Sequence, residues 1–165
     1  MATATYDLIA SQTLASAASS ITFSSIAASW TDLRLVLTAS ATSATTAYSY
    51  VNGDNSGGHY SSTNIYGDGT NSGSQKTTNT NGINLTINSI PTGKWATFTI
   101  DYLSYAGSTY KTYLTTESND QNGTGYTSRW VALWRNTAAI TSVTLYVDTT
   151  FATGTTASLY GIKAA

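Results

Sequence analysis

The amino-acid sequence predicts an all-β protein, organised as a single antiparallel β-sandwich with a jelly-roll-like arrangement of strands. Three observations lead to this prediction. Thr and Tyr, which favour strands, number 32 and 12 among the 165 residues. Gly, Asn and Ser, which favour turns, number 13, 11 and 22, whereas helix-forming Glu, Lys and Gln are scarce. Short alternating apolar and polar runs recur between these turn residues, and no useful stretch has the 3.6-residue apolar period of a helix.

The first half of the chain contains one clear strand, from Asp32 to Leu37, because Leu33, Leu35 and Leu37 share one face. Further strands are predicted at Tyr6 to Ala10, Ile21 to Phe23 and Tyr48 to Val51. Asn52-Gly53 follows the last of these and predicts a turn. Residues 52–82 are rich in Gly, Asn, Ser and Thr, and they predict a long loop with at most one short strand, around Asn64 to Gly67.

The second half alternates more regularly. Arg129 to Arg135 is apolar on both faces, which predicts a central strand that is covered on both sides; Trp130 and Trp134 share one face and are predicted core residues. The other predicted strands are Ile83 to Ile87, Ala96 to Tyr102, Tyr110 to Thr116, Val143 to Val147 and Leu159 to Ile162. Nine or ten strands at this spacing suit a sandwich or barrel. We expect one domain over residues 1–165, with a short N-terminal arm at residues 1–5.

The composition excludes several classes of function. Only 9% of the residues are charged and the net charge is -1, too little to hold a nucleic-acid backbone. The absence of cysteine removes disulfides, thiolate nucleophiles and metal–thiolate sites. No apolar run approaches the roughly 18 residues that cross a bilayer, and the first residues lack the pattern of a secretory signal. We therefore expect a protein made in a cytoplasm, with neither nucleic acid nor membrane as a partner.

Catalytic and metal-binding motifs are weak. The eight acidic residues include Asp101 and the neighbours Glu117 and Asp120, but no pair is placed by the sequence across a substrate. His59 is the only histidine and has no nucleophile motif beside it. Asn52 to Asn55 and Asp68 to Asn71 offer oxygen ligands that would suit Ca²⁺, although Asx-turns explain them equally well. We expect no enzymatic activity, no cofactor and no metal.

Several stretches in fixed order carry a resemblance to a known family. They are Tyr6 to Ser16, Ile21 to Phe23, Thr31 to Leu33, Asn52 to Asp54, Tyr60 to Thr63, Tyr66 to Gly69, Asn136 to Ser142 and Leu159 to Lys163. Together they resemble a group of β-sandwich proteins from tailed-bacteriophage virions. The resemblance implies a capsid decoration (cement) protein or minor capsid protein on the capsid exterior, assembled in the bacterial cytoplasm. It also implies the major capsid protein as partner and a homotrimer as the assembly. Related domains occur in tail fibres and baseplates, so a receptor-binding or carbohydrate-binding module is the alternative.

Aromatic side chains in loop-like segments are the candidate binding residues. Tyr and Trp combine an apolar face with a polar tip, which suits protein interfaces and also the stacking of sugar rings. The candidates are Tyr60, Tyr66, Tyr105, Tyr126 and Trp30. The pattern fits a capsid or trimer interface and, under the alternative, a host glycan site.

Overall fold

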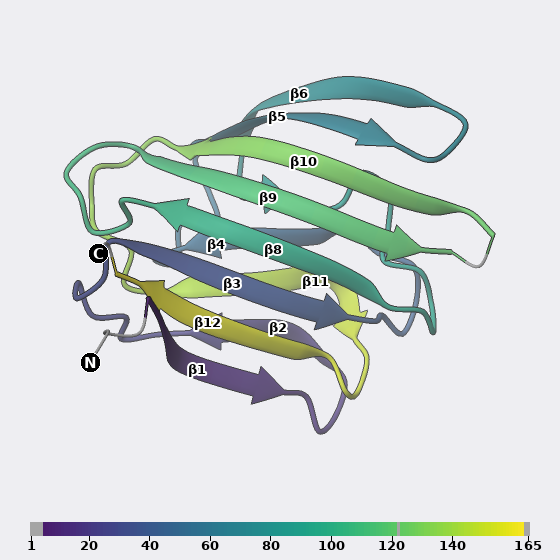
Figure 1. Cartoon of the computed structure of the whole chain (residues 1–165), viewed down its shortest axis with the longest axis horizontal. Helices are drawn as coiled ribbons and strands as arrows, with labels where there is room; N and C mark the ends of the chain where they lie inside the picture. The colour runs from purple at the N-terminus through teal and green to yellow at the C-terminus, as the bar shows by residue number, and fades with distance from the viewer. Residues whose placement is uncertain (1–4, 122, 164–165) are drawn as a thin grey trace.

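The protein consists of two antiparallel β-sheets packed face to face, which confirms the predicted all-β sandwich (Figure 1). The computed structural model describes residues 5–121 and 123–163, and within them there are twelve strands and no helix. The strands are β1 (Tyr6–Thr13), β2 (Ala18–Phe23), β3 (Asp32–Ala39), β4 (Ala47–Val51), β5 (Tyr60–Gly67), β6 (Ser72–Thr80), β7 (Ile83–Asn84), β8 (Ala96–Leu103), β9 (Lys111–Asp120), β10 (Gly125–Trp134), β11 (Val143–Phe151) and β12 (Thr156–Ile162).

The two sheets differ in size. The large sheet has eight strands in the order β1-β12-β3-β8-β9-β10-β5-β6, and the small sheet has four in the order β2-β11-β4-β7. In Figure 1 the small sheet lies behind the large one, and the β5–β6 hairpin forms the upper margin. This strand order does not confirm the jelly-roll arrangement. The described part of the chain contains no helix that could span a membrane.

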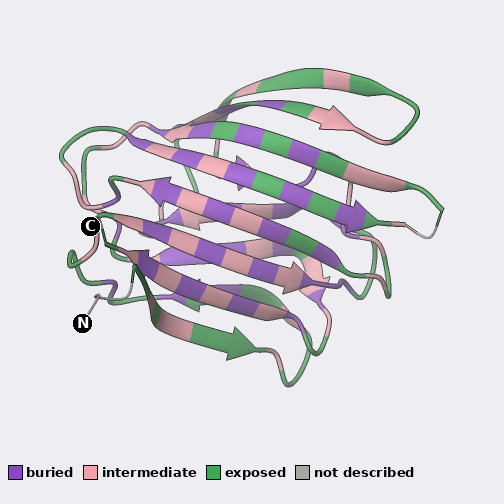
Figure 2. Cartoon of the chain, viewed as in Figure 1, coloured by how far each residue is buried: buried purple, intermediate pink, exposed green. Residues whose placement is uncertain are grey.

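The core lies between the two sheets and follows from the alternation of the sequence (Figure 2). On β3 the side chains of Leu33, Leu35 and Leu37 are fully buried, as predicted. Each such leucine contributes about 1.5–3 kcal/mol relative to an exposed one. The small sheet supplies the opposing layer, for example Ile21 of β2 and Leu145 of β11. The alternating segments that pack in this core form strands because the fold removes one face of each strand from water.

The region predicted to be a long loop contains two strands instead. β5 and β6 pair as an antiparallel hairpin, so the prediction of at most one short strand in residues 52–82 is wrong. The error has a physical cause: β6 is an edge strand whose residues are mostly exposed on both faces, so its sequence carries no apolar alternation. Asn52-Gly53 does form the predicted turn, with φ values of 52° and 68°.

β10 also differs from expectation. Trp130, Ala132 and Trp134 point into the molecule and are buried, which confirms the two tryptophans as core residues. Val131 lies on the opposite face and is 48% exposed, so β10 is covered on one side only. The apolar residues on its outer face are part of the surface. The predicted N-terminal arm, residues 1–5, lies outside the described residues except for Thr5.

Candidate functional site

The outer face of the large sheet is the widest surface that the fold leaves open. The small sheet packs on its inner face, and the described chain places no second layer on the outer one. Four large hydrophobic side chains reach solvent there: Ile65 is 66% exposed, Leu8 60%, and Tyr6 and Val131 48% each. They form two groups, Tyr6 with Leu8 on β1 and Val131 with Ile65 on β10 and β5, and four strands separate β1 from β10. Single exposed apolar residues are ordinary, but two such groups on one face make this face a candidate interaction surface.

Two hollows run along the outer face of the β10–β5–β6 region. One has a volume of about 640 Å³ and is lined in part by Ile65, Thr116 and Arg129. The other, of about 520 Å³, is lined in part by Val131 and Lys76. Within the described part of the chain, the charged residues that line them are Arg129 and Lys76, and both are basic. The hollows are thus apolar depressions with basic margins.

An ion pair holds the middle of the same face. Arg34 of β3 donates two hydrogen bonds to Asp101 of β8, at 2.5 Å and 2.8 Å. The hydrogen bonds to Asp101 raise the pKa of Arg34. Arg34 also donates to the Tyr6 hydroxyl at 2.9 Å, and its guanidinium carbon lies 5.6 Å from the centre of the Tyr6 ring. The pair therefore orients one of the exposed aromatic side chains of the face.

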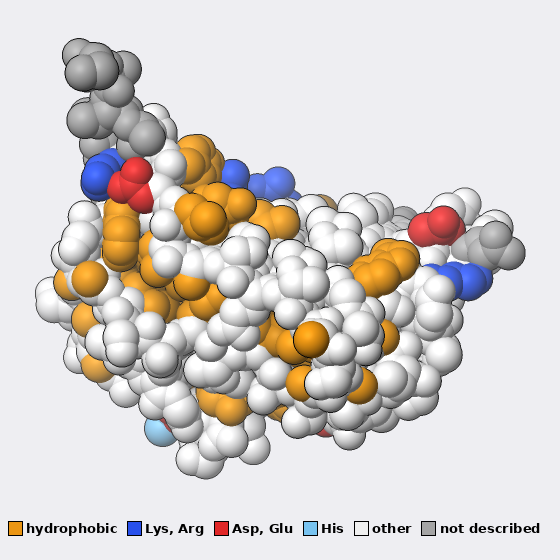
Figure 3. Space-filling view, turned by 90° about the horizontal axis from the view of Figure 1, so that it is seen from below, with side chains coloured by type: hydrophobic (Ala, Val, Ile, Leu, Met, Phe, Trp, Pro, Cys, Tyr) orange, Lys and Arg blue, Asp and Glu red, His pale blue; other side chains and the backbone are white. Residues whose placement is uncertain are grey.

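The surface as a whole carries little charge. Figure 3, seen from below the view of Figure 1, shows hydrophobic side chains in separate patches within a mostly uncharged polar surface. A surface of this kind favours contacts through shape, apolar burial and hydroxyl hydrogen bonds over ion pairs. This agrees with the 9% of charged residues in the sequence.

The five predicted aromatic residues do not form one site. Tyr60 begins β5 and Tyr105 lies in the turn after β8, and both are buried, so the structure contradicts their predicted exposure. Tyr60 is the first residue of β5 and points inward, where its hydroxyl accepts a hydrogen bond from the Val51 amide at 3.1 Å. Tyr105 donates to the Ala27 carbonyl oxygen at 2.5 Å. Both residues hold the core together and present no surface to a partner.

Trp30 is half-buried at the end of the molecule where β1 and β12 meet. Its indole packs over Gly161 of β12, where a Cβ atom would overlap the ring. The indole nitrogen donates to Asp7 Oδ2 at 3.1 Å, and Lys163 Nζ lies 2.7 Å from the same oxygen. Hydrogen bonds from Lys163 and Trp30 lower the pKa of Asp7. Trp30 is thus held in place by its neighbours within the chain.

Tyr66 of β5 and Tyr126 of β10 are partly exposed, but both lie in strands and not in the loop-like segments expected from the sequence. The Tyr66 ring lies over Gly73 of β6, and Tyr126 lines a hollow of about 520 Å³ between the 67–69 turn and residues 123–127. Four strands separate β12, where Trp30 packs, from β5. The structure therefore does not bring Trp30 together with these two tyrosines.

The acidic candidates lie apart from one another. Glu117 points inward on β9 and is fully buried, whereas Asp120 points to the opposite face and is exposed. Asp68 accepts hydrogen bonds from the amides of Thr70 and Asn71 at 2.8 Å and 2.5 Å, so it forms the Asx-turn that the sequence also allowed. These backbone hydrogen bonds lower the pKa of Asp68. The described residues contain no cluster of three or more His, Cys, Asp or Glu that could hold a metal ion.

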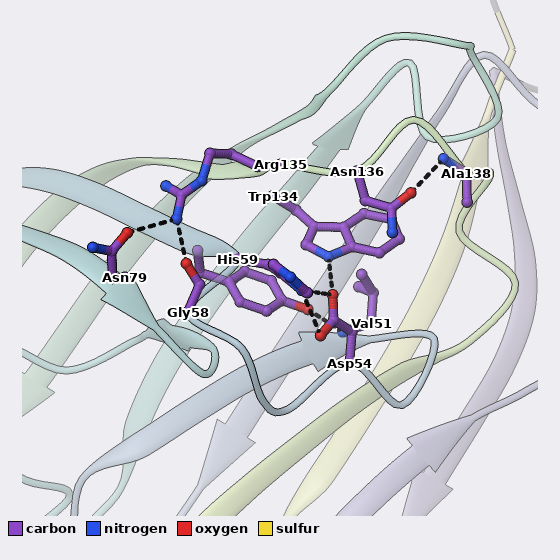
Figure 4. A network of polar contacts seen from close by, with 10 residues as sticks. Val51, Asp54, Gly58, His59, Asn79, Trp134, Arg135, Asn136 and Ala138 are labelled. Carbon is purple, nitrogen blue, oxygen red and sulfur yellow. Dashed lines mark hydrogen bonds and ion pairs between the residues drawn. The ribbon is translucent and has the colours of Figure 1, made fainter.

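Asp54 is the centre of a polar network that joins the turn after β4 to the end of β10 (Figure 4). Its Oδ2 atom accepts a hydrogen bond from the Trp134 indole at 2.6 Å and lies 2.8 Å from His59 Nδ1. Arg135 donates to the Gly58 carbonyl oxygen and, at 2.9 Å, to Asn79 Oδ1. His59 has no hydroxyl partner among the described residues, so the Asp–His pair lacks the third group of a nucleophilic triad. The network fixes the 52–59 segment against the core.

Comparisons with known proteins give no further assignment: no family model, no curated protein and no solved structure matches the chain.

The sequence candidates missed Tyr6, Leu8, Ile65 and Val131, which carry the exposed apolar area of the large sheet. The sequences of β1 and β10 do contain these apolar residues. From the sequence alone they look like core residues, because only the sheet order shows which face of each strand is left uncovered.

Proposed function

We propose that the chain is a structural protein of a tailed-bacteriophage virion, a decoration protein that binds the outer capsid surface and stabilises the shell. The observation that carries the proposal is the uncovered outer face of the eight-stranded sheet, with its exposed Leu8, Ile65 and Val131. The resemblance of the sequence to virion β-sandwich proteins supplies the biological setting. The partners in this proposal are the major capsid protein and other copies of the chain in a homotrimer.

The size of the face suits this role. Eight strands about 4.8 Å apart, each with about eight residues at roughly 3.3 Å per residue, give a face on the order of 1,000 Å². A standard protein–protein interface buries about 800 Å² on each partner. One face of the sheet is therefore large enough for a stable contact with a capsid lattice.

Purified virus particles provide the test. Cryo-electron microscopy would locate the chain, and quantitative mass spectrometry would give its copy number relative to the major capsid protein. Hundreds of copies at icosahedral positions on the exterior would support the proposal. A few copies confined to the tail would overturn it in favour of a receptor-binding module of a tail fibre or baseplate.

A further inference from the structure

The small sheet carries three tyrosines on its own outer face, away from the large sheet. Tyr48 and Tyr50 lie on β4, and Tyr146 lies on the neighbouring strand β11, directly opposite Tyr48. The rings of Tyr48 and Tyr146 are stacked, with centroids 5.0 Å apart and planes 18° apart. Tyr50 lies against Tyr146 at 5.4 Å with a tilt of 55°. Almost a hundred residues separate the two strands in sequence, so only the fold brings the rings together.

Two hollows flank the Tyr146 ring. One, of about 400 Å³, is lined by Tyr48, Tyr146, Asp148 and the 77–84 segment; the other, of about 330 Å³, is lined by Tyr50, Tyr146 and residues of β2. Tyr146 and Asn81 line both. Gly82 closes the turn beside them: a Cβ atom there would lie 3.0 Å from the Ser49 carbonyl oxygen and 3.8 Å from the Tyr146 ring. The two hollows and the ring between them form one bent groove, which we name the tyrosine groove.

The remaining lining groups are mostly amides and hydroxyls, with one carboxylate and the aliphatic Val147. Amides come from Asn55, Asn79, Asn81 and Asn84. Among the described residues that line the two hollows, Asp148 is the charged one and none is Lys or Arg. Burial, and then the neighbouring Tyr48, Asp148 and Tyr50, raise the pKa of Tyr146. The groove thus offers flat aromatic faces beside many hydrogen-bond donors and acceptors.

This chemistry selects among possible ligands. A phosphate or carboxylate ligand would meet the Asp148 carboxylate with no cation among the lining residues to offset it. An apolar segment would find, among the described lining residues, a single aliphatic side chain, that of Val147. A neutral sugar matches both parts of the groove, because its C–H face packs on an aromatic ring while its hydroxyls exchange hydrogen bonds with amides and carboxylates.

We propose that the tyrosine groove binds a neutral oligosaccharide, which packs on the solvent-facing parts of the Tyr48, Tyr50 and Tyr146 cluster and is hydrogen-bonded by Asn81 and Asp148. Because two hollows share the central ring, the ligand spans at least two sugar units. The groove and the outer face of the large sheet lie on opposite sides of the sandwich. The inference goes beyond attachment to a capsid and does not depend on it, since the isolated chain carries the whole groove.

An array of immobilised neutral oligosaccharides, of two to six units built from glucose, galactose, mannose and N-acetylglucosamine, tests the proposal with the purified chain. Saturation-transfer NMR then measures any member that is retained. We expect retention of at least one member, and a loss of about tenfold in affinity for Tyr48→Ala and for Asn81→Ala. Tyr110→Ala is the matched control, because Tyr110 is 53% exposed and lies outside the groove; it should bind as the unmodified chain does.

Three outcomes would overturn the proposal. One is a folded chain that retains no neutral member at millimolar ligand. Another is binding that Tyr48→Ala and Asn81→Ala leave unchanged, which would move the site elsewhere. The third is retention of acidic glycans or of peptides in place of neutral sugars. Circular dichroism identifies a misfolded variant, and Asn81→Ala keeps the test open if Tyr48→Ala does not fold, because Asn81 is an exposed turn residue. None of these results depends on where the chain sits in a virion.

Discussion

Glu117 is a carboxylate in a place that suits a neutral group better. It is fully buried on the inner face of β9, where Oε2 accepts hydrogen bonds from the Ile87 amide at 2.9 Å and from Ser128 at 2.7 Å. Oε1 has no hydrogen-bond partner among the described residues. Removal from water outweighs the hydrogen bonds and raises the pKa of Glu117. The ionised form of Glu117 therefore destabilises the folded chain, and solution pH controls how much of this form is present.

Glu117→Gln should stabilise the protein at neutral pH. The raised pKa means that the folded chain holds the proton more tightly than the unfolded chain does. This favourable contribution is complete below the ordinary pKa of 4.5 and is lost as pH rises through the raised value. Urea unfolding between about pH 4 and pH 8 should therefore show the variant gaining stability over the unmodified chain as pH increases. A constant difference across that range would mean that Glu117 is not buried as described.

The Asp54 carboxylate stabilises the fold, whereas the buried charge of Glu117 destabilises it. It is the acceptor for the indole nitrogen of Trp134, a side chain that is only 1% exposed. Asp54→Ala leaves that buried donor unpaired, which we expect to lower the free energy of unfolding by about 1–3 kcal/mol. Denaturant titration followed by tryptophan fluorescence measures the loss. Asp148→Ala, at an exposed carboxylate, should change stability by less than about 0.5 kcal/mol, and an equal loss in both variants would contradict the assignment.

At the level of the strand, β12 depends on a glycine. Gly161 lies where the Trp30 indole crosses the strand, and any side chain there must displace the ring. Gly161→Ala should therefore lower stability by roughly 1–3 kcal/mol and break the Trp30–Asp7 hydrogen bond. Gly67→Ala in β5 is the matched control, because the nearest atom to its new Cβ would be 3.8 Å away. Similar melting temperatures for the two variants would refute the proposed packing of Trp30.

How well the sequence predicts an element depends on whether one of its faces is buried. β3 and β8 show clear alternation because one face of each packs in the core, and both were predicted from the sequence alone. β6 has no buried face, so nothing in Ser72 to Thr80 distinguishes a strand from a loop. An edge strand of this kind follows from pairing with β5, which is a tertiary property.

The candidate binding residues, like the strands, depend partly on tertiary contacts that the sequence does not show. Tyr60 follows a Gly-rich stretch, and Tyr105 lies between Ser104 and Ala106-Gly107, so both look exposed in the sequence. In the structure Tyr60 begins a strand and Tyr105 packs under the segment before Trp30. Tyr48 and Tyr146 look like ordinary strand residues, and their contact needs the pairing of β4 with β11. The sequence offered tyrosines in loop-like segments as candidates, and neither Tyr48 nor Tyr146 was among them. It could not say which tyrosines meet, because that depends on strand order.

On the scale of the whole molecule, the outer face of the large sheet and the outer face of the small sheet should have roles that mutations can separate. A charge placed on the outer face of the large sheet should weaken attachment to particles without unfolding the domain. We expect Val131→Asp and Ile65→Asp each to reduce occupancy on virus particles by about tenfold, because both side chains are exposed in the monomer. Ser108→Asp, in an exposed loop, is the control. Normal occupancy of both face variants would place the docking surface elsewhere.

The low charge of the molecule makes a second prediction about attachment. With 9% charged residues, binding that rests on apolar burial and hydrogen bonds should persist in about 1 M NaCl, where charges are screened within about 3 Å. Sedimentation of particles at low and high salt, followed by quantification of the bound chain, measures this. Release at high salt alone would show that the few ion pairs carry the contact.

The strand order also bears on how the protein is made. β12, the last strand, lies between β1 and β3, and β2 has β11 as its partner. At about 5–20 residues per second, a ribosome needs roughly 10–30 s to synthesise the residues from β1 to β12, and for nearly all of that time β1 and β2 lack the strands with which they pair. The sandwich therefore closes only after synthesis of its final strand. Until then the nascent chain exposes apolar residues that the folded protein buries, such as Ile21 and Phe23 of β2. The early strands are therefore candidates for chaperone contact, and for aggregation when expression is fast.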